Sequence, residues 1–100
     1  MTHEDAIREL FEQLTDIGVE RKNRITGLYF DRMWKKQASY AKWACYELLI
    51  LLKKEKNKPA VLIVEEFIHK MDMYSTMNPK NSFIFSVAKD TAENFLDRLL

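Results

Sequence analysis

Three side chains within residues 59–77 have types and spacing that suit metal binding. Glu65, His69 and Asp72 follow one another at intervals of four and three residues, which places them on one side of a helix. Two carboxylates and an imidazole can coordinate a divalent cation. Metal sites in helical bundles draw ligands from at least two helices, and the only other histidine is His3. We therefore interpret the set as an exposed polar helix face and expect no metal and no cofactor.

The chain offers one cysteine and no catalytic motif. Cys45 lies in an apolar stretch without a local cluster of bases, so we expect a small buried side chain rather than a reactive thiol. Gly18 and Gly27 are the only glycines, which excludes a phosphate-binding P-loop and a dinucleotide-binding fingerprint. We expect no enzymatic activity, and no small-molecule substrate is evident.

The middle of the chain is basic, although the net charge is only +1. Residues 21–58 hold eleven bases and three acids, whereas residues 1–20 hold one base and six acids. Basic side chains interleaved with aromatic ones can hold phosphates and stack bases. The competing interpretation is a solvated helix face, because nucleic-acid binders usually carry a larger overall basic excess. The candidates for nucleic-acid binding, our second hypothesis, are Arg21, Lys22, Arg24, Arg32, Lys35, Lys36 and Lys42.

Two segments carry more apolar residues than one buried helix face needs. Trp43, Tyr46 and Ile50 recur at helical spacing away from an alanine-rich side, and a thinner stripe follows further along the chain. A helix that is apolar on two sides is central in its bundle or lies at an interface. Our first hypothesis is a small non-enzymatic protein-interaction module that forms a homodimer or serves as a subunit or adaptor. The partner-binding candidates are Trp43, Tyr46, Ile50, Leu62, Met73 and Met77.

The elements that must position these residues are helices. Apolar residues recur every three or four positions along most of the chain, which is the period of amphipathic helices. We predict an all-α, single-domain protein over residues 1–100, a bundle of about four helices at residues 3–17, 28–55, 59–77 and 82–99. Gly18 is expected to end the first, shorter helix, and the second is expected to be the longest. The expected buried stripe of the first helix is Ile7, Leu10, Phe11, Leu14 and Ile17.

Two further expectations follow from the apolar runs and the cysteine. The longest uninterrupted apolar runs are five residues, Leu48–Leu52 and Ala60–Val64, whereas a membrane span needs roughly 20. The first ten residues lack the apolar block of a signal peptide, and a lone cysteine is compatible with a reducing compartment. We expect a cytoplasmic protein that makes no contact with a membrane.

Overall fold

The described part of the protein consists of four α-helices and one short 3-10 turn. The computed structural model describes the backbone of residues 2–25 and 32–100, and the side chains of residues 2–18 and 35–100. The helices are α1 (His3–Ile25), α2 (Arg32–Lys54), α3 (Ala60–Met77) and α4 (Ser82–Leu99), and the 3-10 turn Pro79–Asn81 precedes α4. The described residues include no strand. The prediction of an all-α bundle of four helices is confirmed.

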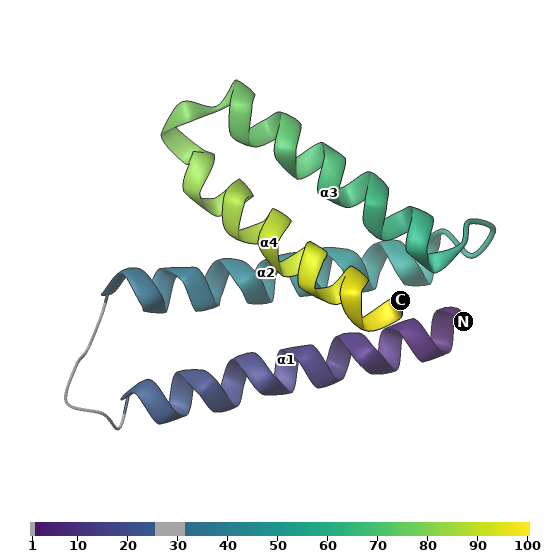
Figure 1. The fold of residues 1–100 in the computed structure, drawn as a ribbon, viewed down its shortest axis with the longest axis horizontal. Helices are drawn as coiled ribbons and strands as arrows, with labels where there is room; N and C mark the ends of the chain where they lie inside the picture. The colour runs from purple at the N-terminus through teal and green to yellow at the C-terminus, as the bar shows by residue number, and fades with distance from the viewer. Residues whose placement is uncertain (1, 26–31) are drawn as a thin grey trace.

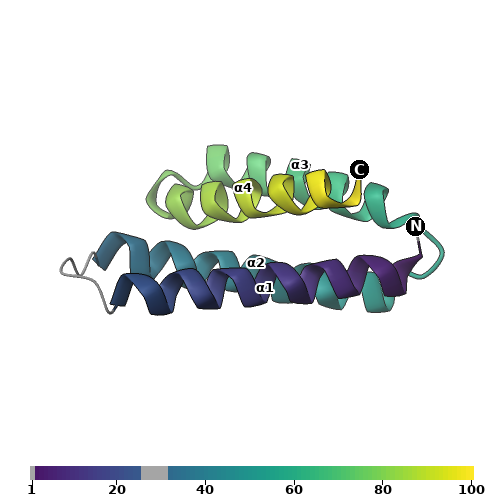
Figure 2. The ribbon, with the colours of Figure 1, turned by 60° about the horizontal axis from the view of Figure 1, so that its bottom comes forward.

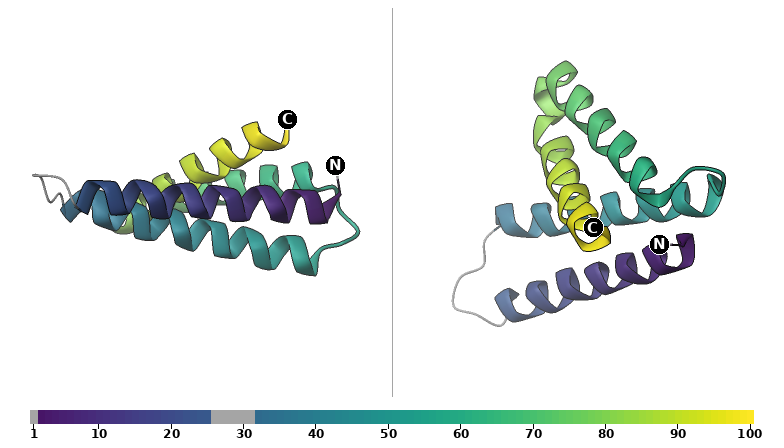
Figure 3. Two further views of the ribbon diagram at one scale, coloured as in Figure 1. Left: turned by 90° about the horizontal axis from the view of Figure 1, so that it is seen from below. Right: turned by 45° about the vertical axis from the view of Figure 1, so that its right-hand side comes forward.

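The four helices form two layers. α1 and α2 lie side by side and antiparallel, and the α3–α4 hairpin crosses over them (Figure 1). α4 contacts all three other helices, whereas α3 packs mainly on α4 and α2. The turn between α3 and α4 projects beyond the edge of the α1–α2 layer (Figure 3, right). One face of the α1–α2 layer is thus covered, whereas the opposite face, at the bottom of Figure 2, carries no other described helix.

A single apolar core joins the two layers. Leu10 of α1, Leu48 of α2 and Phe95 of α4 are all completely buried, and burying a side chain of this size stabilises the fold by roughly 1.5–3 kcal/mol. Small residues on α2 and α4 let the helices approach closely. The described core cluster comprises Ala6, Leu10, Ala44, Cys45, Leu48, Leu52, Ala60, Ile63, Val64, Phe67, Met71, Ala88, Ala92, Phe95 and Leu99.

Two polar contacts made by described side chains help to fix the position of α4 on α1. The buried Gln13 side chain donates a hydrogen bond from Nε2 to the carbonyl oxygen of Thr91 at 3.0 Å. Closer to the chain terminus, Arg98 donates to the carboxylate of Asp16 at 2.6 Å. The first contact is worth about 1 kcal/mol, and the second contributes less because it is solvent-exposed. Both select one register between the two helices.

The helix boundaries differ from the predicted ones at α1. This helix continues to Ile25 and has 23 residues, as does the described part of α2, so the predicted end at residue 17 is wrong. Gly18 lies inside the helix because a glycine costs only about 1 kcal/mol there relative to alanine, which the flanking turns can offset. The predicted start of the second helix, residues 28–31, lies outside the described residues.

The other helix ends agree with the sequence within one residue. α2 ends at Lys54 rather than residue 55, and α3 begins at Ala60 rather than residue 59. Pro59 occupies the position just before the helix, with φ −57° and ψ 143°. Differences of this size are usual at helix ends. α4 spans residues 82–99 as predicted.

Gly18 provides a test of the longer α1. A Cβ atom built at this position meets no atom within 4 Å, so Gly18→Ala adds helix propensity without a clash. We expect the free energy of unfolding to rise by about 0.5–1 kcal/mol, measured by urea denaturation followed by circular dichroism. A fall in stability would instead place Gly18 in the left-handed conformation of a helix end.

Candidate functional site

The outward face of α2 exposes two large apolar side chains. Leu48 marks the buried face of this helix, since its side chain is completely buried. Tyr46 and Ile50 each lie two residues away, about 200° around the helix axis, and are 54% and 57% exposed. Both therefore point away from the core. They are two of the residues that the sequence assigned to a partner surface.

Trp43, the third member of that predicted stripe, has a different environment. Its side chain is only partly exposed and packs against the core cluster. A large indole ring can reach from the edge of a helix face back towards the core, which its position on the helix does not reveal. Trp43 thus forms a partly buried border of the exposed stripe rather than its centre.

Lysines surround the apolar stripe of α2. Residues 35–54 contain five lysines and a single acid, Glu47. Four of the lysines are exposed and Lys42 is half-buried. Within the described part of the chain no ion pair forms with Lys36, Lys42, Lys53 or Lys54, as the salt bridges there involve other residues. The face consequently combines exposed apolar area with a positive potential.

The neighbouring face of α1 has the opposite charge and one exposed aromatic ring. Phe11, which the sequence placed in the buried stripe, is 49% exposed. Gln13, two residues further on, faces α4, so Phe11 points away from that helix. Residues 3–18 hold five acids and one base, and both Glu4 and Glu12 are exposed. The sequence analysis did not identify Phe11 as a surface residue, because Phe11 lies at the border of the apolar stripe. It is about 100° around the helix axis from the buried Leu10.

The apolar stripe on α3 is separate and less continuous. Leu62, Met73 and Met77 are all exposed, as predicted for a second surface. They belong to the other layer, and the exposed Glu66 and His69 lie between them along the helix. The exposed apolar residues of α3 and those of α2 therefore lie in different layers and do not form one continuous surface.

The helix segments that carry the basic candidates for nucleic-acid binding meet at one end of the α1–α2 pair, except that Lys42 lies near the middle of α2. The C-terminal end of α1 and the N-terminal end of α2 adjoin each other (Figure 1), and α2 has no acid in its first turn. Lys35 and Lys36 are exposed, and Lys42 is half-buried. The side chains of the other four candidates lie outside the described ones, namely those of Arg21, Lys22, Arg24 and Arg32.

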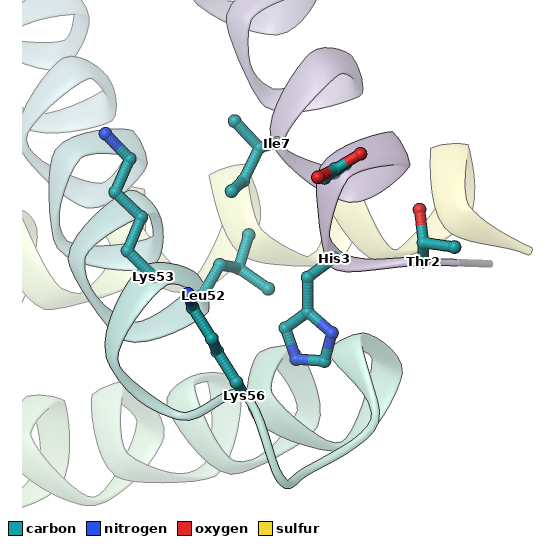
Figure 4. A pocket seen from close by; sticks show the side chains of 7 residues that line it. Thr2, His3, Ile7, Leu52, Lys53 and Lys56 are labelled. Carbon is teal, nitrogen blue, oxygen red and sulfur yellow. The ribbon is translucent and has the colours of Figure 1, made fainter.

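A cavity of about 520 Å³ opens at the other end of the same pair, between the start of α1 and the end of α2. Ile7 and Leu52 supply its apolar wall, and the His3 ring lies on the side nearer Lys56 (Figure 4). The Nε2 atom of His3 lies 3.2 Å from the carbonyl oxygen of Glu55, a contact that ties the two helix ends together. The residues lining the cavity are Thr2, His3, Glu4, Ile7, Leu52, Lys53 and Lys56.

Two of the groups with possible catalytic or metal chemistry, Cys45 and Asp72, have structural roles. Cys45 is completely buried, and burial raises the pKa of its thiol to about 11, so that the poorly nucleophilic neutral thiol predominates near pH 7. Asp72, from the sequence set with His69, instead accepts a hydrogen bond from Lys89 Nζ at 3.1 Å. Among the described residues no three His, Cys, Asp or Glu side chains are grouped for metal binding.

Comparisons with known proteins do not assign a family. No family model, no curated protein and no solved structure matches this chain. In the part of the chain that the structure describes, none of the helices combines the length and the apolar character needed to cross a membrane.

Proposed function

We propose that the protein is a small, non-enzymatic protein-interaction module that binds its partner through the face of the α1–α2 layer opposite α3 and α4. The observation that carries the proposal is the exposure of Tyr46 and Ile50, each more than half accessible, on the outward face of α2. Two such side chains within one helical turn resemble the aromatic and aliphatic anchors at the centre of protein interfaces. The proposal includes a cytoplasmic location, with which the free Cys45 is compatible.

The arrangement around these anchors supports a protein partner. Trp43 borders the stripe and is held by packing against the core, so little conformational entropy is lost when a partner covers it. Lysines around the stripe favour a partner with acidic residues and disfavour a basic one. Phe11 of α1, which is 49% exposed and points away from α4, offers a further apolar contact.

A second candidate function is nucleic-acid binding at the basic end of the α1–α2 pair. It rests on the convergence of the basic segments at the end of α1 and the start of α2 (Figure 1). Lysine and arginine side chains there would hold phosphates, and the affinity would fall steeply with salt.

The interaction surface can be tested by photo-crosslinking in cells. A photoreactive benzoylphenylalanine in place of Tyr46 is expected to form covalent adducts with protein, because its ring would enter the interface. The same residue in place of Asn94, an exposed position on α4, serves as the matched control and should give several-fold fewer adducts. Ile50→Ser should also weaken the adducts of position 46 several-fold, since it removes the adjacent apolar contact. Equal labelling at positions 46 and 94 would contradict the proposal.

The nucleic-acid candidate requires a separate measurement. We expect labelled mixed-sequence DNA or RNA to bind the protein saturably at micromolar concentration, with an affinity that falls as salt is added. Fluorescence anisotropy of the labelled nucleic acid measures this binding. Lys35→Glu combined with Lys36→Glu should lower the affinity at least about tenfold. Lys70→Glu should change it little, because Lys70 lies beside Leu51 and Glu55 at the opposite end of α2. Absence of binding even at low salt would eliminate this function.

A further inference from the structure

We infer that the partner of this surface is a second copy of the same chain, with α1 of each copy lying on α2 of the other. The inference rests on the proposed function, because it names the occupant of the same face. It follows from two features of the α1–α2 layer, its charge and the level of its exposed apolar side chains, which one two-fold arrangement satisfies together.

The two helices carry opposite charges in equal number. Residues 3–18 of α1 hold five acids and one base, whereas residues 35–54 of α2 hold five lysines and one acid. Within the described part of the chain neither Glu4 nor Glu12 forms an ion pair, and the same holds for Lys42 and Lys53. Each helix of one copy therefore offers unpaired charges that complement those of the other helix in a second copy.

The exposed apolar residues Phe11 of α1 and Tyr46 of α2 lie at the same level along the helix axes. Glu4 of α1 and Lys53 of α2 line the same cavity, which sets the relative height of the antiparallel helices. Phe11 lies seven residues after Glu4, and Tyr46 lies seven residues before Lys53. Because every residue of a helix rises by the same 1.5 Å, Phe11 and Tyr46 come to the same level.

A two-fold axis parallel to the helices satisfies both features at once if it lies at the free face, the face of the α1–α2 layer opposite α3 and α4. Rotation about such an axis keeps each residue at the same position along the helix direction and exchanges the places of α1 and α2. As a result, α1 of one copy lies on α2 of its partner. Phe11 then meets Tyr46 of the second copy at the same level, and Glu4 reaches Lys53. The contact is closed, since each copy uses the same patch and leaves no complementary patch for a third copy.

The size of this face indicates a weak dimer. Two adjacent helices present a face roughly 20 Å wide, and residues 4–18 extend over roughly 22 Å. About 450 Å² per copy is well below the roughly 800 Å² of a standard stable interface. The dimer is accordingly expected to dissociate in the micromolar range and to weaken as salt screens its charges.

Charge reversal and mixing test the arrangement. One variant carries Glu4→Lys and Glu12→Lys on α1, and the other carries Lys42→Glu and Lys53→Glu on α2. Each alone is expected to dimerise at least about tenfold more weakly than the unaltered chain, because like charges then meet in both contacts. An equimolar mixture should regain the dimer, since both contacts of the heterodimer again pair opposite charges. Sedimentation velocity measures the association, and circular dichroism verifies that each variant is folded.

The outcomes separate this inference from the proposed function. The unaltered chain should dimerise, with its dissociation constant rising at least about tenfold between 0.1 M and 1 M salt, a measurement that needs no variant. A monomer up to about 1 mM, an undiminished dimer in the α1 variant, or folded variants that fail to associate on mixing would each overturn the inference. Crosslinking of position 46 to a different protein would retain the interaction module and reject the second copy.

Discussion

The burial of one face of α4 against both α1 and α2 is the interaction on which the rest of the structure depends. α4 is in contact with each of the other helices, and Phe95 joins Leu10 and Leu48 in the completely buried core. If α4 did not pack on α1 and α2, the α1–α2 and α3–α4 hairpins would each expose an apolar face, and helix propensity alone cannot compensate for that in an isolated helix pair. The buried Gln13 hydrogen bond then selects the register in which this packing occurs.

The same packing makes the α1–α2 layer asymmetric. Its upper face is covered by α4 and part of α3, whereas no other described helix lies on its lower face (Figure 2). Phe11, Tyr46 and Ile50 remain about half exposed, so the hydrophobic effect still favours removing them from water. The opposite charges of the two helices determine which surfaces can approach this face. Function is therefore proposed from what the core leaves uncovered rather than from a pocket or a catalytic group.

Sequence periodicity predicted the number, type and order of the helices because each helix buries one apolar stripe. It failed at Gly18, where a weak local preference for ending a helix is overcome by the turns on both sides. It also misplaced Phe11 and Trp43, both at the edges of their stripes. Residues at such borders become buried or exposed according to how neighbouring helices cross, which depends on tertiary packing and not on spacing along one helix. Tyr46 and Ile50, opposite the centre of the buried face, could be recognised from sequence.

Hydroxyl-radical footprinting at increasing protein concentration tests most directly whether the free face of the α1–α2 layer is the interface. We expect oxidation of Phe11 and Tyr46 to fall together as the protein associates, while Met73 and Met77 on α3 stay as reactive as in dilute solution. Association accompanied by protection of the α3 methionines, with Phe11 and Tyr46 unchanged, would contradict the account and transfer the interface to the other layer.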